Sequence, residues 1–178
     1  VVGAEVQTTE NAKVGADSLA RASHYRTQRE IDPFTFPCLF AKRARAVVEK
    51  TETTLDDCAR ASVKAYANAN KNGFAHMRSF KMSFENASTA SDKNPVFLSN
   101  PEFKDYLRVS DCSQVSDGGS AILLCSEEGL SRIGRKLFDC IEVIGYSVAT
   151  ASIMEEPDPL VLDTTRRAAD QAYLQAQV

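Results

Sequence analysis

A glycine turn that leads directly into an apolar run constrains the fold of this 178-residue chain more than any other feature. Asp117-Gly118-Gly119 precedes residues 120–125, which include one Ile and two Leu and carry no charge. A continuous apolar run after a turn is typical of a central strand buried on both faces. The first six residues, Val1–Val6, lack polar alternation in the same way and predict a second buried strand.

Two helices are well defined between these strands. The first is expected over residues 35–48, where Pro37 is tolerated in the first turn and the apolar residues share one face. The second begins at Thr54, and Asp57 three residues later makes a pairing that resembles a capping box. Its apolar residues keep the helical period, and Asn72-Gly73 is expected to end it.

The remaining segments are shorter. Polar, alanine-rich residues 8–30 predict irregular structure with one helical stretch, and residues 102–107 predict a helical turn. Ser126 is expected to cap a helix, residues 138–148 to form a strand, and Asp163 to cap a final helix. The order of strand, helical insertion, strand, helix, strand and helix predicts an α/β fold.

Composition and charge exclude several classes of protein. With 43% hydrophobic and 25% charged residues, the chain is not a disordered tail. Its formal net charge of −3 provides no broad positive field, so nucleic acid is not an expected partner. Small basic clusters in residues 42–45 and 132–136 suit a few phosphates better than a polymer. No apolar run approaches the roughly 20 residues that cross a bilayer, so no membrane span is expected.

The cysteines do not indicate a zinc site or a disulfide framework. None of the five forms a C-x-x-C pair, and reduced thiols in an intracellular compartment are the simplest interpretation. Cys125 and Cys140 are predicted to be core residues, and Cys58 falls on the apolar stripe of its helix. Cys112 lies in a polar loop, but no activating base is visible, and spacing alone cannot place a thiol beside His24 or His76.

The loop over residues 112–120 is the most unusual stretch. Its glycines allow close backbone approach, and Ser113 and Ser116 offer hydroxyls at the mouth of the predicted strand, where ligands of α/β sheets often bind. A tight turn in which Asp117 satisfies backbone amides is an equal alternative. It is not a Walker phosphate loop, because the Gly-Lys-Ser/Thr ending is missing. The cluster at residues 42–45 is either a solvated face or an anchor for nucleotide phosphates.

Several of these segments resemble thiolases in the same order. Residues 113–127, Ser-Gln-Val-Ser-Asp-Gly-Gly-Ser-Ala-Ile-Leu-Leu-Cys-Ser-Glu, resemble the Asp-Gly-Ala-Ala-Ala…Ser-Glu strand of that family. The opening Val-Val-Gly-Ala-Glu is similar to the strand that follows the nucleophile helix. The helix over residues 55–71, with its Ala-x-x-Ser centre and Asn-Gly-Phe ending, resembles a helix of the thiolase loop domain. Short Asn-Pro pieces, and Cys112 before Ser113, are similar to the sterol-carrier-protein type.

The resemblance implies an α/β, thiolase-like fold fragment, with mixed sheet layers, helices and a mostly helical loop-domain insertion. It implies four parts: the end of the N-terminal thiolase domain (1–7), the loop domain (8–110), the last strand and helix of the N-terminal domain (111–136), and the start of the C-terminal domain (137–178). Because the chain opens without Met inside a predicted strand, we expect a piece of a longer protein. The catalytic Cys and His residues of the family would lie outside this piece, so none is assigned here.

The resemblance further implies residues that bind coenzyme A. Ser113, four residues before Asp117-Gly118, matches the serine that thiolases place against the pantetheine amide, within a substrate-binding segment that includes Val115 and Ser116. Candidates elsewhere are basic residues for the nucleotide phosphates and a methionine for the acyl or pantetheine tunnel: Arg43, Arg108 and Met154.

The implied activity is that of an acyl-CoA thiolase, an acetyl-CoA C-acyltransferase that cleaves or forms 3-ketoacyl-CoA through a cysteine thioester. Coenzyme A and acyl-CoA would be substrates, not tightly bound cofactors. A homodimer or homotetramer in a peroxisome-like organelle or mitochondrion is expected from the family. Two alternatives stay open. One is a non-catalytic thiolase-like protein that binds acyl-CoA or a partner, and the other is a helical assembly module that pairs through the stripe at residues 36–48.

Overall fold

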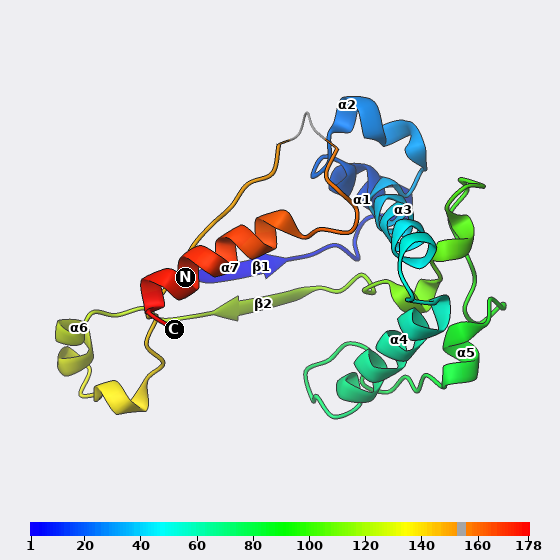
Figure 1. The fold of residues 1–178 in the computed structure, drawn as a ribbon. Coiled ribbons are helices and arrows are strands. Elements are labelled where there is room, and N and C mark those ends of the chain that lie inside the picture. Colours follow the sequence, from blue (N-terminus) through cyan, green and yellow to red (C-terminus); the bar gives the residue numbers. More distant parts are fainter. Residues whose placement is uncertain (153–155) are drawn as a thin grey trace. The chain divides into compact units, whose positions relative to one another are not determined.

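The computed structural model describes residues 1–152 and 156–178, which divide into two compact units (Figure 1). Gln7–Ser116 form the first, which we call the helical unit, and Val1–Val6 with Asp117–Val178 form the second, the ribbon unit. The described residues contain helices and one two-stranded sheet, so the mixed α/β class is confirmed. The layered thiolase-like fold and the four domain ranges stay predictions.

The helical unit contains five α-helices among its described residues: α1 (Ala12–Ala20), α2 (Tyr25–Gln28), α3 (Thr35–Lys50), α4 (Leu55–Ala69) and α5 (Phe84–Ser88). Short 3₁₀ turns lie at Arg29–Ile31, Lys104–Tyr106 and Val109–Asp111. The helix predicted over residues 35–48 and the helical turn predicted over residues 102–107 are confirmed. Residues 8–30 hold two helices where the composition predicts one helical stretch.

The capping box predicted before α4 is present. The Thr54 hydroxyl accepts from the Asp57 amide at 3.2 Å, and the Asp57 carboxylate accepts from the Thr54 amide at 2.9 Å. The predicted end of this helix is wrong, since α4 stops at Ala69 and not at Asn72-Gly73. The side-chain amide of Asn70 donates to the carbonyls of Arg78 and Phe80, so the chain leaves the helix early and folds back.

The apolar core of the helical unit lies along one face of α3. Cys38 and Ala41 are fully buried against Leu98, Phe103 and Leu107 from the segment after α5. Removing apolar side chains from water stabilises such a cluster by about 25 cal/mol per Å². Segments that lie far apart in the sequence therefore meet in one core.

Two buried polar side chains hold the loops of this unit. Asp32, which is 4% exposed, accepts from the amides of Phe34, Ser99 and Asn100 at 2.7–2.8 Å. Asn94 likewise accepts from the Ser110 amide at 2.9 Å and donates to the Asn86 carbonyl. Because buried polar groups are costly unless they are hydrogen-bonded, these contacts fix the paths of the connected segments.

The ribbon unit is built on an antiparallel pair of strands, β1 (Val2–Glu5) and β2 (Gly118–Ala121). Val2 pairs with Ala121, and Glu5 pairs with Gly118. The unit also holds α6 (Glu127–Arg132), a 3₁₀ turn at Leu137–Asp139 and α7 (Asp163–Ala176). Ser126 caps α6 as predicted, since its hydroxyl accepts from the Gly129 amide at 3.2 Å.

The prediction of two buried strands is wrong for the described residues. β1 and β2 are exposed along their whole lengths, and residues 122–126 are not in a strand. An apolar run is buried only where another surface covers it, and Ile122, Leu123 and Leu124 are 64–76% exposed. The apolar run at residues 120–125 therefore correctly predicted that a strand pairs here, but it wrongly predicted that the strand is buried.

Residues 138–148, predicted as a strand, form none. The chain instead runs beside α7, where the Tyr146 amide donates to the Gln175 side chain at 2.9 Å. A Cβ on Gly145 would come far inside contact distance of the Ala172 carbonyl, so glycine permits this close approach. Asp163 is the first residue of α7 and not its cap, and its carboxylate instead pairs with Arg166 and Arg167.

We predict that Thr54→Ala destabilises the helical unit by about 1 kcal/mol, because the Asp57 amide loses its capping acceptor. Urea denaturation followed by circular dichroism measures the change. Thr53→Ala is the matched control, since Thr53 takes part in the described contacts through its backbone amide and not through its hydroxyl. Equal midpoints for the two variants would contradict the capping role.

Candidate functional site

The segment that carries the predicted serines is fixed to α4 by one carboxylate. Asp111, in the 3₁₀ turn Val109–Asp111, accepts from the Ser62 hydroxyl at 2.9 Å through one oxygen. Its other oxygen accepts from the Arg108 amide at 2.9 Å. Ser62 is buried on α4, a helix whose N-terminus has a capping box. Asp111 therefore attaches the start of residues 108–116 to this helix.

The rest of this segment folds on itself and leaves Ser113 exposed. The Gln114 side-chain amide donates to the carbonyls of Val109 and Cys112 at 3.1 and 3.2 Å. Ser116 donates to the Gln114 carbonyl at 3.3 Å, and Val115 is 55% exposed. No described residue is a hydrogen-bond partner of the Ser113 hydroxyl. Of the two candidate serines, Ser113 is the one whose hydroxyl is free to meet a ligand.

Cys112 points the other way, against the core of the helical unit. It packs on the core cluster, and its sulfur lies 3.7 Å from the Arg108 carbonyl oxygen. Burial, with a smaller contribution from the Asp111 carboxylate, raises the pKa of the Cys112 thiol to about 11. Because the thiolate is the reactive form, this cysteine is a poor nucleophile near neutral pH, in agreement with the sequence analysis.

The two candidate phosphate-binding arginines have different surroundings. Arg108 is 9% exposed, and its guanidinium lies 3.9 Å from the Asp111 carboxylate, so its charge is held inside the helical unit. Arg43 is half-buried on α3. Neighbouring Arg45 binds Glu49 and Glu102 at 2.7 and 2.5 Å. Of the two candidates, Arg43 has the more accessible side chain, and phosphate binding stays a prediction for both.

Met154, the candidate for a tunnel wall, lies outside the described residues.

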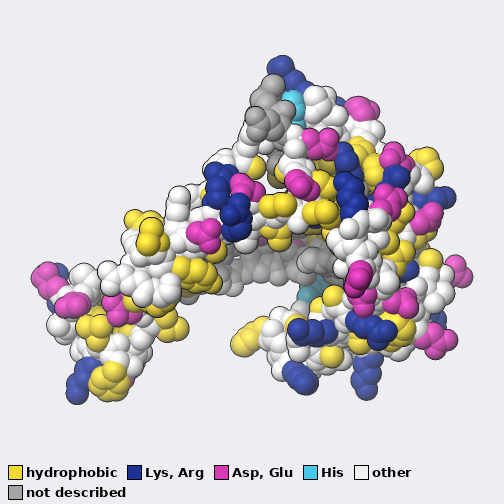
Figure 2. Space-filling model, viewed as in Figure 1, with side chains coloured by type: hydrophobic (Ala, Val, Ile, Leu, Met, Phe, Trp, Pro, Cys, Tyr) yellow, Lys and Arg dark blue, Asp and Glu magenta, His cyan; other side chains and the backbone are white. Residues whose placement is uncertain are grey.

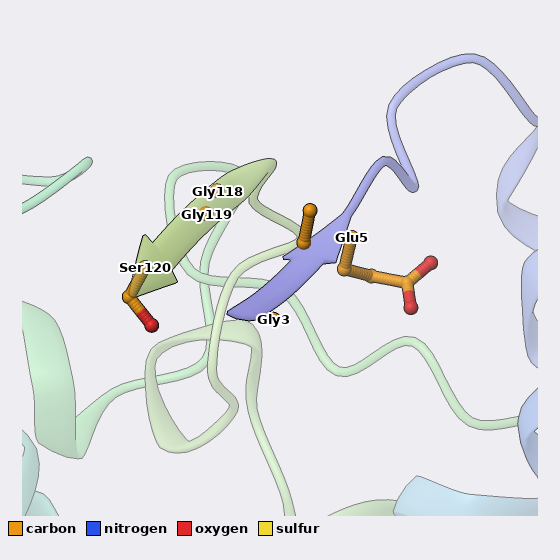
Figure 3. Close-up of a pocket in the computed structure, with 6 residues that line it drawn as sticks. Gly3, Glu5, Gly118, Gly119 and Ser120 are labelled. Atoms are coloured by element: carbon orange, nitrogen blue, oxygen red, sulfur yellow. The ribbon is translucent and has the colours of Figure 1, made fainter. Parts of the chain in front are cut away.

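The β1–β2 ribbon carries an open hollow of about 420 Å³ (Figure 3). Apart from Glu5, the residues that line it have short side chains or none: Gly3, Ala4, Glu5, Gly118, Gly119 and Ser120. Figure 3 shows the Glu5 and Ser120 side chains pointing away from each other. The hollow has no convergent polar groups of the kind that fix a small ligand, so it does not form a binding site by itself.

Within residues 1–152 and 156–178, no group of three His, Cys, Asp or Glu side chains is placed to hold a metal ion. None of the helices in the same ranges has the length and apolar character needed to cross a bilayer.

Comparison with known proteins indicates a class of acyl-transferring enzymes. No protein-family model matches the chain. It is 26% identical over 181 residues to the acetyl-CoA acetyltransferase of Methanothermobacter thermautotrophicus, an alignment that covers 100% of the chain and 43% of that protein. It is 30% identical over 147 residues to the acetyl-CoA acetyltransferase of Methanocaldococcus jannaschii, covering 81% of the chain and 34% of that protein. The chain thus spans less than half the length of these relatives.

These similarities support assignment of the chain to the thiolase family of acyltransferases. They agree with the family resemblance of residues 113–127 and of the helix after Thr54. They do not distinguish the sterol-carrier-protein type from other members.

The contact between Asp111 and Ser62 was missed by sequence reasoning. The two residues are 49 positions apart, and neither the helical period of α4 nor the glycine turn indicates that they meet. The one available signal was Ser62, which ends the Ala-x-x-Ser pattern and is a small polar residue on an otherwise apolar helix face.

We predict that Cys112 reacts slowly with iodoacetamide in the folded protein. With a pKa of about 11, about one Cys112 thiol in 1,000 is ionised at pH 8. Peptide mass spectrometry should show labelling of exposed Cys125 and Cys140 well before Cys112. The Cys112 rate should rise roughly tenfold per pH unit up to about 11 while the fold persists. Rapid labelling of Cys112 at pH 7 would contradict its burial.

Proposed function

We propose that this chain is the central part of an acyl-CoA thiolase, an acetyl-CoA C-acyltransferase that cleaves or forms 3-ketoacyl-CoA through a cysteine thioester. The observation that carries the proposal is the similarity to two acetyl-CoA acetyltransferases over 100% and 81% of the chain. A match that runs through both units and through the Ser113 segment is more specific than a match to either strand or helix alone.

In this proposal the chain binds coenzyme A, and the reacting thiolate comes from residues outside it. Thioester chemistry needs an activated cysteine and donors that stabilise the charge on the carbonyl oxygen. Cys112 does not meet the first requirement, because burial raises its pKa to about 11. The non-catalytic contribution of the chain is therefore to position the coenzyme.

Ser113 is the residue proposed to hold the pantetheine arm. A hydroxyl both donates and accepts, so it can bind either side of an amide. The Ser113 loop is already ordered by Gln114 and by Asp111, which reduces the conformational entropy lost when a ligand binds. Val115 offers an exposed apolar surface beside it for the aliphatic part of the arm.

The finer parts of the proposal follow from the family resemblance. They are the sterol-carrier-protein type, coenzyme A and acyl-CoA as substrates, assembly as a homodimer or homotetramer, and a peroxisome-like organelle or mitochondrion as the compartment. A non-catalytic thiolase-like protein that binds acyl-CoA or a partner is the competing hypothesis.

We predict that Ser113→Ala, made in the full-length gene product that contains this chain, raises KM for coenzyme A about fivefold. Loss of one hydrogen bond of about 1 kcal/mol has this effect. Because the bond is expected in the ground state and the transition state alike, kcat should change little. Thiolysis of acetoacetyl-CoA measures both constants. Ser18→Ala, at an exposed position of α1, is the matched control and should leave both unchanged.

The same assay separates the hypotheses. A full-length protein that binds coenzyme A without any thiolysis favours the non-catalytic alternative. A protein that binds no coenzyme A contradicts the proposal.

We also predict that Cys112→Ala retains thiolysis in the full-length protein, because a buried thiol with a pKa of about 11 is not the nucleophile. The substitution removes a partly buried sulfur, so thermal unfolding should be measured beside activity to detect any loss of folded protein. Complete loss of activity in a variant with an unchanged melting temperature would overturn the assignment of Cys112.

A further inference from the structure

Asn72 is the one asparagine of this chain that precedes a glycine. Asn72 and Gly73 are both exposed in the loop that follows α4. The side-chain carbon of an asparagine can be attacked by the backbone nitrogen of the next residue, and glycine hinders that attack least because it has no side chain. The loop therefore exposes to solvent the asparagine of this chain that is chemically most open to such an attack.

The two nitrogens that would take part in the reaction are not held by the fold. Among the described residues, neither the Gly73 amide nitrogen nor the Asn72 side-chain nitrogen has a hydrogen-bond partner. A Cβ added to Gly73 would meet no atom within 4 Å, so the side of the chain where a side chain would lie is open. Both nitrogens can therefore move without breaking a described contact.

The side-chain oxygen of Asn72 is held in a way that favours the attack. It accepts a hydrogen bond from the Phe74 amide at 3.0 Å. Negative charge develops on this oxygen when a nucleophile adds to the side-chain carbon, and a fixed N–H donor stabilises such charge. The Arg78 guanidinium donates to the Gly73 carbonyl at 2.6 Å, which holds the next residue in place.

Asn70 is the opposite case in the same loop. Its side-chain amide donates to two backbone carbonyls at 2.9 and 2.8 Å, so the nitrogen that would have to leave is held. The nitrogen that would have to attack, the Lys71 amide, donates to the Asn68 carbonyl at 3.0 Å. The fold thus protects Asn70 and leaves Asn72, two residues further on, unprotected.

We propose that Asn72 is a site of spontaneous deamidation in the folded protein. The Gly73 nitrogen adds to the Asn72 side-chain carbon, and the new C–N bond closes a succinimide ring. The side-chain nitrogen leaves as ammonia and takes up the proton that the Gly73 amide gives up. Water then opens the ring at either carbonyl and leaves an aspartate or an isoaspartate, so the reaction consumes water, releases ammonia and needs no oxidant. This inference does not depend on the proposed function.

The product reverses the local charge pattern. Residues 70–82 contain basic side chains and no Asp or Glu, and Figure 2 shows Lys and Arg side chains gathered over α4 and the segment that follows it. A carboxylate that replaces a neutral amide makes the formal net charge of −3 one unit more negative. Isoaspartate also lengthens the main chain by a methylene group before Gly73, which should weaken the contact of its carbonyl with Arg78.

The test incubates the full-length gene product that contains this chain at pH 8 and follows it by peptide mass spectrometry, in which fragment ions distinguish Asn70 from Asn72. We expect deamidation at Asn72, while Asn70 stays unchanged. The incubated protein should also accept methyl groups from an isoaspartyl-specific methyltransferase. Gly73→Ala should slow the reaction at Asn72 about tenfold, since a Cβ restricts the approach of the attacking nitrogen.

Gly15→Ala is the matched control, because a Cβ at Gly15 likewise meets no atom within 4 Å, and it should leave the rate unchanged. A second comparison uses the same protein unfolded in urea, where Asn72 should react at a similar rate. A rate at Asn72 that rises manyfold on unfolding overturns the inference, because the fold would then protect this residue. So does deamidation of Asn70 ahead of Asn72 in the folded protein, or a rate that Gly73→Ala leaves unchanged.

Discussion

The helical unit depends on a buried carboxylate that is held by backbone amides. Asp32 accepts from three of them, one at the start of α3 and two in the segment at residues 99–100. A charged acceptor that is enclosed by amides forms strong hydrogen bonds, and losing any one of them leaves a charge poorly solvated. Asp32 thereby fixes the segment that delivers Phe103 and Leu107 to the core. Asn94 holds the next part of the chain in place, because its side-chain oxygen accepts from the Ser110 amide. Ser110 precedes Asp111, the carboxylate that fixes the Ser113 segment to α4.

Local signals in the sequence predicted the helices well. The Thr54–Asp57 cap, the apolar stripe after Thr35 and the Ser126 cap each act over one or two turns, so a short window contains the whole interaction. The end of α4 was misplaced because Asn70 binds carbonyls eight and ten residues away, which no helical period encodes. The prediction that the strands at residues 1–6 and 120–125 are buried failed because it inferred burial from composition. Burial requires a second surface, and the composition of one segment does not contain it.

The candidate site could be predicted in part. The glycine turn and the thiolase-like pattern directed attention to Ser113, and the structure leaves its hydroxyl exposed. Sequence alone could not reveal that Arg108 is enclosed or that Cys112 packs on the core, because burial depends on residues that lie far away in the sequence.

The register of the two-stranded ribbon has a consequence for how the protein can change. Glu5 and Gly118 are direct partners, so the chain leaves the ladder at one rung and rejoins it on the opposite strand at the same rung, after traversing the whole helical unit. Closing such a loop costs conformational entropy that grows only with the logarithm of its length. Insertions or deletions within residues 7–116 therefore have little effect on the pairing of the two strands. The helical unit can be replaced by another sequence whose two ends lie close together, in evolution or by engineering.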